Sequence, residues 1–169
     1  EILRCLVGSE MCIRDRAIPD EWRLLVANPD RYTFISDEEK IIAIPAEYTT
    51  DYKLLDQHLD LLHAGITVTT LKGKDYVPHI SLALSTAFDT NKVVHYEASL
   101  DTALAYLRRE SLFLPTDLPR GYILVTYEGF PLGWVKHLGN RTNNLYPQEW
   151  RIRSGHTPDT PFELNIAPK

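Results

Sequence analysis

Short apolar runs in the first part of the chain predict a small helix followed by a β-hairpin. The apolar residues between Trp22 and Val26 lie at helical spacing, and Pro29 ends that pattern. The runs 32–35 and 40–44 are rich in β-forming residues and are joined by a short polar segment. Two such runs around a polar connection are typical of a hairpin.

The pattern in the middle of the chain is ambiguous. Residues 52–63 suit either a helix or a strand, depending on which leucines are taken to face a core. Gly65 ends this segment, and the β-branched run at 67–71 predicts a strand. Residues 78–85 predict a short helix, because proline is tolerated in the first helical turn.

The second half of the chain contains the clearest helix and a group of strands. Residues 99–110 predict a helix, since Ser99 can cap its first turn and apolar side chains recur along one face. A turn and a polar loop at residues 138–146 separate three predicted strands, at residues 121–127, 132–137 and 149–153.

This order of elements predicts the α+β fold class, with two small units. We expect a small α+β domain at residues 17–94, a helix followed by a small β-barrel at residues 95–153, and a flexible tail at residues 154–169. Units of this size bury little of their surface and are marginally stable alone. We therefore expect them to pack against each other and against sequence outside this chain.

Residues 1–16 do not resemble the start of a globular protein. Their apolar run is too short for a signal peptide and is interrupted by charged side chains. The sequence at 6–15 also matches the translation of a nucleotide string that resembles a sequencing-library adapter. We therefore predict that residues 1–16 are a disordered assembly artefact. Cys5 and Cys12 are the two cysteines of the chain and lie within it, so we expect neither a disulfide nor a zinc pair.

Composition adds information mainly through the distribution of charge. The 169 residues are 44% hydrophobic and 24% charged, and no apolar run approaches the ~20 residues of a membrane helix. The net charge is −5, which argues against a nucleic-acid partner. Residues 17–119, however, carry 9 Lys/Arg and 16 Asp/Glu, whereas residues 120–153 carry 5 Lys/Arg and 2 Asp/Glu. Only the second stretch can supply a surface that faces phosphate.

The same stretch carries groups suited to binding RNA. Its cations are interleaved with amides, which pair with base edges and phosphate oxygens, and with aromatic rings, on which an unpaired base can stack. The alternative is that Trp134 and Trp150 belong to the core or to a hairpin face, and that Asn143 and Asn144 are turn residues bonded to their own backbone. Tyr146 before Pro147 can simply fix a turn.

The sequence PLGWVKHLGNRTNNLYPQEWRIR resembles the PUA-like RNA-binding domain of RsmF-type ribosomal-RNA methyltransferases in the NOL1/NOP2/Sun family. The resemblance rests on Leu132-Gly133, Lys136, Leu138-Gly139, Arg141, Asn143-Asn144, Tyr146-Pro147 and Trp150-Arg151. It continues more weakly upstream, where it includes residues 103–110 and a smaller domain with Gly65, Lys72-Gly73-Lys74 and residues 78–84. At Arg108-Arg109 related proteins often carry a glycine.

The resemblance implies a function that depends on sequence outside this chain. Family members methylate cytosine C5 with S-adenosylmethionine, and a cysteine thiolate is the nucleophile. Outside residues 1–16 the chain has neither cysteine nor a glycine-rich cofactor loop, so we expect no catalytic residue, no bound cofactor and no activity of its own. The expected partners are ribosomal RNA and a missing N-terminal methyltransferase domain, in the cytoplasm and without a membrane.

The resemblance and the local charge together predict a set of RNA-binding residues: Lys136, Asn140, Arg141, Asn143, Asn144, Arg151, Arg153, Lys72 and Lys74. For the two lysines near Gly73, an ordinary exposed turn is an equally good interpretation. The six histidines are scattered without metal spacing, so we expect no metal site. Two further readings stay open: a module that mainly packs against other domains, and a binder of a small molecule.

Overall fold

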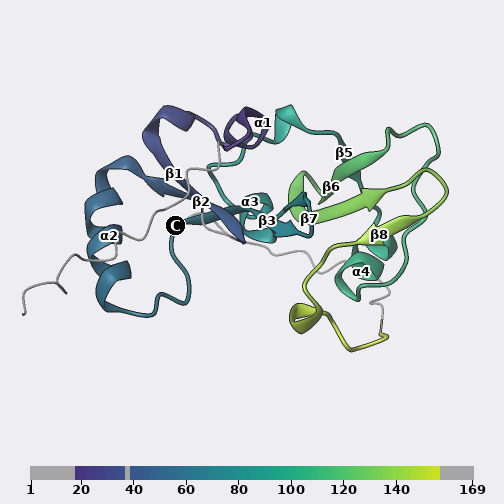
Figure 1. The fold of residues 1–169 in the computed structure, drawn as a ribbon. Coiled ribbons are helices and arrows are strands. Elements are labelled where there is room, and N and C mark those ends of the chain that lie inside the picture. The colour runs from purple at the N-terminus through teal and green to yellow at the C-terminus, as the bar shows by residue number, and fades with distance from the viewer. Residues whose placement is uncertain (1–17, 37–38, 157–169) are drawn as a thin grey trace, which may run out of the picture. The chain divides into compact units, whose positions relative to one another are not determined.

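The computed structural model describes residues 18–36 and 39–156, which form two compact units that divide between Val77 and Pro78 (Figure 1). The predicted artefact at residues 1–16 lies outside the described residues, as does most of the predicted tail at 154–169. The α+β class is confirmed, because both units contain helices and each is built around one four-stranded sheet.

The first unit is a sheet in the order β1-β2-β3-β4, formed by Tyr32–Ser36, Lys40–Pro45, Ile66–Lys72 and Asp75–Pro78. The first two strands form the predicted antiparallel hairpin, with Tyr32 opposite Pro45. Buried side chains of β2 and β3, such as Ile41 and Val68, form the core. Short helices surround the sheet: α1 (Asp20–Arg23), η1 (Pro29–Arg31), η2 (Ala46–Tyr48) and α2 (Thr49–His58).

The structure resolves the ambiguous middle segment as a helix. The α2 helix covers Thr49–His58, and Leu59 has left the helical conformation with a φ of −135°. None of its residues is buried, so hydrophobic periodicity could not identify it clearly. The strand β4 was not predicted, and the helix expected at residues 78–85 is shorter, because Pro78 ends β4 and α3 covers Ile80–Ala83.

The second unit is a sheet in the order β5-β6-β7-β8. Its strands are His95–Glu97, Gly121–Tyr127, Phe130–His137 and Thr142–Asn144, and β5 is parallel to β6 whereas the other pairs are antiparallel. The predicted helix is present as α4 (Leu100–Leu107), with the Ser99 hydroxyl accepting from the Thr102 backbone N–H. Two 3-10 turns, η3 (Thr90–Lys92) and η4 (Gln148–Trp150), complete the unit.

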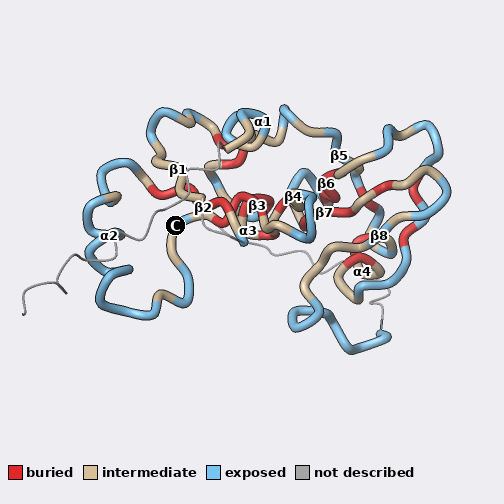
Figure 2. The backbone as a smooth tube through the Cα atoms, viewed as in Figure 1, coloured by how far each residue is buried: buried red, intermediate tan, exposed pale blue. Residues whose placement is uncertain are grey.

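The core of the second unit lies between α4 and the sheet (Figure 2). Tyr106 of α4 is fully buried against Ile123 and Val135, and its hydroxyl donates to the Trp134 carbonyl at 3.3 Å. Burial also raises the pKa of Tyr106 far above its usual value, so the hydroxyl stays protonated as a donor. Trp134 is 2% exposed and bonds to the His79 carbonyl at 3.1 Å, which confirms the core interpretation of this tryptophan.

A carboxylate holds the β6–β7 turn. Glu97 accepts hydrogen bonds from the Thr126 hydroxyl and from the Gly129 backbone N–H. The bond from Thr126 is the main reason why the pKa of Glu97 is lowered. The parallel strand β5 is therefore fixed to the hairpin by side chains as well as by its ladder.

Three features of this unit differ from the predictions. The strands β5 and β8 were not predicted, because three residues are too few to form a recognisable pattern of β-forming residues in the sequence. The final strand predicted at 149–153 is wrong, because Pro147 starts a 3-10 turn there. The domain boundary expected at residue 94 remains a prediction, while the compact units divide before α3, which packs on β7 through the bond between Trp134 and His79.

Gly133 fits a position that a larger residue cannot occupy. Its φ is +147°, and a Cβ atom there would collide with the Tyr106 hydroxyl. Gly121 has a similar φ of +133°, but a Cβ there would meet nothing within 4 Å. We therefore expect Gly133→Ala to cost ~1–3 kcal/mol more than Gly121→Ala in the free energy of unfolding, measured with urea. Equal costs for the two variants would show that only backbone strain matters at Gly133.

Candidate nucleic-acid interface

The C-terminal end of α4 is closed by a residue in the left-handed conformation. Arg109 has a φ of +65°, and its N–H donates to the Tyr106 carbonyl while the Glu110 N–H donates to the Ala105 carbonyl. This pair of bonds is the Schellman arrangement, in which glycine is preferred at the left-handed position. Arg109 adopts this left-handed conformation although it is not a glycine.

Asn144, the last residue of β8, and the segment that follows it supply further donors to the same helix end. The side-chain amide of Asn144 donates to the Tyr106 carbonyl at 2.9 Å and to the Glu110 carbonyl at 3.2 Å. The Ile152 N–H donates to the Leu107 carbonyl at 3.0 Å. A helix leaves its last carbonyls without partners of its own, so these bonds attach the segment firmly to α4.

Two arginines tie the same segment from the helix side. The Arg108 guanidinium donates to the carbonyls of Ser154 at 2.9 Å and His156 at 2.7 Å. Arg109 donates to the Gln148 side-chain carbonyl at 2.5 Å. Positive side chains are favoured at the end of a helix, where the backbone dipole is negative. These contacts place Arg151 and Arg153 beside the C-terminal end of α4, next to Arg108 and Arg109.

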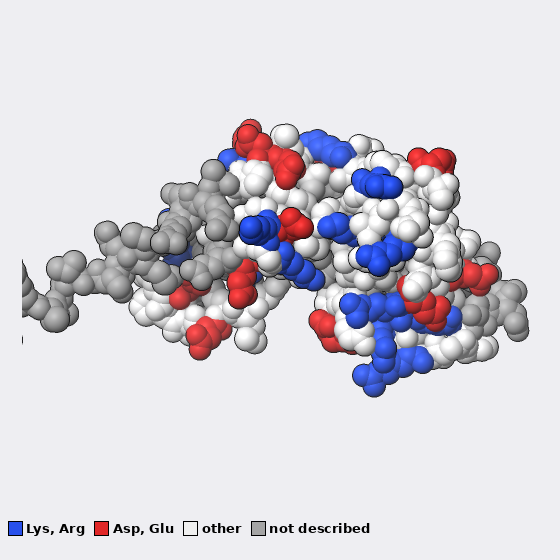
Figure 3. Space-filling view, turned by 45° about the vertical axis from the view of Figure 1, so that its right-hand side comes forward, with Lys and Arg blue, Asp and Glu red and all other residues white. Residues whose placement is uncertain are grey.

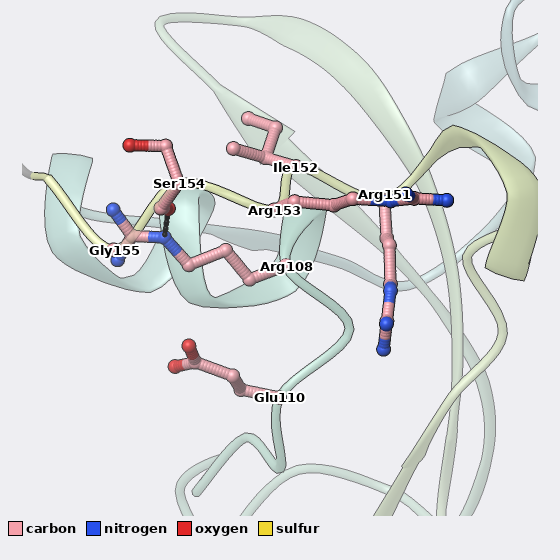
Figure 4. A pocket seen from close by; sticks show the side chains of 7 residues that line it. All are labelled: Arg108, Glu110, Arg151, Ile152, Arg153, Ser154 and Gly155. Atoms are coloured by element: carbon pink, nitrogen blue, oxygen red, sulfur yellow. Dashed lines mark hydrogen bonds between the residues drawn. The ribbon is translucent and has the colours of Figure 1, made fainter.

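Two neighbouring pockets lie at this helix end. One, of about 320 Å³, is lined by Arg108, Glu110 and residues 151–155, and Figure 4 shows its side chains. The other, of about 300 Å³, is lined by Arg109, Glu110, Ser111, Thr142, Asn143, Asn144, Gln148 and Arg151. Because Glu110 and Arg151 line both, the pockets form one surface, which we call the α4-end surface.

The sheet extends this surface with a row of aligned side chains. Tyr122, Lys136 and Asn143 are direct partners across β6, β7 and β8, so they share one face of the sheet. The Lys136 ammonium lies 5.3 Å from the centre of the Tyr122 ring, at the distance of a cation–π contact. Asn143 is exposed and also lines the second pocket, which joins the row to the α4-end surface.

The cations of this region are not neutralised by neighbouring acids. Among the described residues, no carboxylate lies within 4.0 Å of Lys136, Arg141, Arg151 or Arg153. Figure 3 shows Lys and Arg side chains gathered on one face, with a few carboxylates beside and among them. The arrangement leaves positive charge available to an anionic partner.

An aromatic path leads from the core to the surface beside these arginines. The Tyr146 ring lies 5.3 Å from the Tyr106 ring and 6.4 Å from the Trp150 ring, both in edge-to-face geometry. Trp150 is 51% exposed and therefore differs from the buried Trp134. Its inner edge is fixed by Tyr146, and its free surface is available for stacking.

The structure brings some of the predicted residues together and separates others. Asn143, Arg151 and Arg153 line the α4-end surface, Lys136 is the cross-strand partner of Asn143, and Arg141 directly precedes β8 and is exposed. Asn140 is exposed in the β7–β8 connection. Lys72 and Lys74 flank Gly73 in the β3–β4 turn of the first unit, so nothing places them on this surface.

For Asn144 the structure supports the turn interpretation. Its amide nitrogen serves two carbonyls, and its side-chain oxygen accepts from the Tyr146 N–H at 2.9 Å. The main task of this side chain is therefore to hold the surface together.

The sequence analysis did not assign Arg108, Arg109, Glu110 or Gln148 to the site. The signal for the two arginines was present, because a basic pair ends the predicted helix 99–110. Glu110 and Gln148 become recognisable only when the segment after β8 is placed on α4, since they are distant from each other in sequence. Trp150 was one of the aromatic residues considered for stacking on a base, and its exposure agrees with that interpretation rather than with the core alternative.

Within residues 18–36 and 39–156, no group of three or more His, Cys, Asp or Glu side chains could hold a metal ion. No helix in that part of the chain is long and apolar enough to cross a membrane.

Comparison with known proteins finds a similarity for part of the second unit. Residues 93–152 match the family model described as the methyltransferase RsmF PUA domain. The resemblance seen in the sequence is thereby confirmed for this segment. The chain is also 30% identical over 84 residues to the ribosomal RNA small subunit methyltransferase F of Erwinia tasmaniensis. That alignment covers 50% of this chain but only 17% of the relative.

Asn143 and Asn144 provide a matched pair of variants. Asn144→Ala removes the donor of two backbone carbonyls and the acceptor of one N–H, so it should lower the free energy of unfolding by ~1–3 kcal/mol. Asn143→Ala removes an exposed amide and should change it by less than ~0.5 kcal/mol. Urea denaturation followed by circular dichroism measures both. An equal effect of the two variants would contradict the anchoring role of Asn144.

Proposed function

We propose that this chain is the RNA-binding C-terminal part of an S-adenosylmethionine-dependent ribosomal-RNA cytosine-5 methyltransferase. In this proposal it holds structured ribosomal RNA so that a target cytosine reaches a catalytic domain outside this sequence. The match of residues 93–152 to the RsmF PUA domain supports it, as does the identity to a small-subunit methyltransferase.

The observation that carries the proposal is the cationic α4-end surface. Four arginines from two distant segments meet at one helix end, and Lys136 is the cross-strand partner of Asn143, which lines the same surface. Within the described part of the chain, Lys136, Arg151 and Arg153 form no ion pair with a carboxylate, so their charges can face phosphate. We assign phosphate contacts to the cations, polar contacts to Asn143 and Gln148, and stacking to Trp150.

The cofactor and the chemistry are assigned to the parent enzyme. A glycine-rich strand–loop–helix commonly holds the adenosyl group. Gly73 lies instead in a turn between β3 and β4, so no helix N-terminus follows it to receive a cofactor. The residues present do not fit S-adenosylmethionine, and we derive no catalytic step through it.

The cation contacts predict a strong dependence of RNA binding on salt. We expect Lys136→Ala, Arg141→Ala, Arg151→Ala and Arg153→Ala each to weaken binding to a ribosomal-RNA hairpin. Each lost phosphate contact should reduce the slope of log affinity against log salt by ~0.7–0.9. Fluorescence anisotropy over a salt series measures both quantities.

Lys53→Ala is the matched control, because Lys53 is exposed on α2 in the first unit. It should leave the slope unchanged. The double variant of Lys72 and Lys74 tests whether the β3–β4 turn also contacts RNA. Affinity that does not respond to salt, or to any of the four substitutions, would reject the proposal.

Trp150 should contribute to binding without contributing much to stability. Its exposed ring can stack on an unpaired base, and such stacking is worth ~1–3 kcal/mol per base. We therefore expect Trp150→Ala to weaken binding of single-stranded RNA by roughly 5- to 100-fold, whereas Trp150→Phe should retain much of the affinity. Binding titrations measure the affinity, and thermal denaturation checks the fold. Equal affinity of the Ala variant would remove Trp150 from the interface.

A second candidate function is packing against another domain. Leu54, Leu55, Leu59 and Leu62 on and after α2 are 46–98% exposed, which is unusual for so many leucines in one segment (Figure 2). A catalytic domain of the parent enzyme would cover such side chains. Deleting residues 118–169 from the full-length enzyme separates the two functions: retained RNA affinity would favour packing, and lost affinity would favour the RNA-binding proposal.

A further inference from the structure

Glu110 is the one acidic side chain that lines both pockets of the α4-end surface. It is exposed, and no Lys or Arg of the described residues lies within 4.0 Å of its carboxylate. In Figure 4 its side chain reaches into the first pocket beside Arg108, whose drawn hydrogen bond runs to Ser154 and not to Glu110. An acid with this setting is surrounded by positive charge and yet keeps its acceptor oxygens available.

The backbone of Glu110 is held by two hydrogen bonds. Its N–H donates to the Ala105 carbonyl at 2.9 Å, and its carbonyl accepts from the Asn144 amide at 3.2 Å. Both bonds belong to the closure of α4, so the residue is fixed between the helix end and the segment after β8. The backbone of Glu110 therefore has a defined position beside Arg151, which lines the same two pockets, and its carboxylate reaches the surface from this fixed point.

A carboxylate is unfavourable on a surface that only attracts phosphate, because it repels the same anions. It is suitable where a base has to be read, since an ionised carboxylate carries two acceptor oxygens and no donor. Guanine presents two adjacent donors on its Watson–Crick edge, the N1–H and the N2 amino group. Adenine and cytosine present one amino donor beside an acceptor, and uracil presents one N–H between two acceptors.

We propose that Glu110 selects an unpaired guanine by accepting hydrogen bonds from its N1–H and N2 amino group, while the arginines of the same pockets hold the flanking phosphates. This inference rests on the proposed RNA-binding function and adds a base preference to it. Single-stranded or looped RNA is the substrate class, because only an unpaired guanine exposes that edge.

The test uses the whole chain and three hairpin RNAs that differ at one loop position. The first has a single guanosine among uridines, the second has inosine there, which lacks the N2 amino group, and the third has adenosine. We expect the protein to bind the guanosine hairpin roughly tenfold more tightly than the inosine hairpin, and more tightly still than the adenosine hairpin. Fluorescence anisotropy at one fixed salt concentration gives the three affinities.

Glu110→Gln should reduce the preference for guanosine over inosine to less than about twofold. Glu149→Gln is the matched control, because it removes the same charge from an exposed residue that lines neither pocket, and it should keep the full preference. The ratio of affinities is the deciding quantity, since either substitution makes the chain less acidic and can strengthen binding to every RNA. Circular dichroism confirms that both variants fold.

The outcomes separate this inference from the proposed function. Salt-dependent binding of all three hairpins with equal affinity would overturn the role of Glu110 and leave the RNA-binding proposal in place. The same conclusion follows if Glu110→Gln keeps the guanosine preference. Absence of binding to any hairpin would overturn both proposals together.

Discussion

The closure of the α4 C-terminus is the constraint on which the rest of the candidate site depends. The last carbonyls of that helix need donors, and the fold supplies them from Arg109, Glu110, Asn144 and Ile152. Because Asn144 ends β8 and Ile152 lies in the segment after it, satisfying the helix also fixes the chain that carries Arg151 and Arg153. A requirement of backbone hydrogen bonding thus places cations from two ends of the domain side by side.

The same closure explains why the arginines do not neutralise themselves. Arg108 uses its guanidinium on the carbonyls of Ser154 and His156, and Arg109 uses its own on Gln148. These bonds hold the segment without consuming a carboxylate, so the positive charges remain in the surface. Helix-end electrostatics favours cations at this position in any case. The same two arginines therefore stabilise the helix end and contribute positive charge to the surface.

Much of the fold follows from the sequence where apolar patterning is strong. The hairpin of β1 and β2, the helix α4 and the strands β6 and β7 were all predicted, because each has a recognisable run or stripe of apolar residues in the sequence. The short strands β5 and β8 were not, since Thr142–Asn144 has no β-forming pattern and is a strand only because β7 lies beside it. The failed strand at 149–153 has a related cause. Its Ile152 N–H bonds to a helix carbonyl, which is a tertiary contact that local sequence does not encode.

Sequence analysis could show which residue types gather in the region of the site, but not how they are arranged. A cluster of cations, amides and aromatics was visible after residue 120, but the separate roles of its members were not: Trp134 is a core residue, Asn144 anchors the helix end and Trp150 is exposed.

The central claim is that RNA contacts the α4-end surface. Two-dimensional NMR of the labelled chain, titrated with a ribosomal-RNA hairpin, tests it most directly. The account predicts the largest amide shifts at residues 108–111, 136, 143 and 148–153; shifts confined to α2 or to the β3–β4 turn would contradict it.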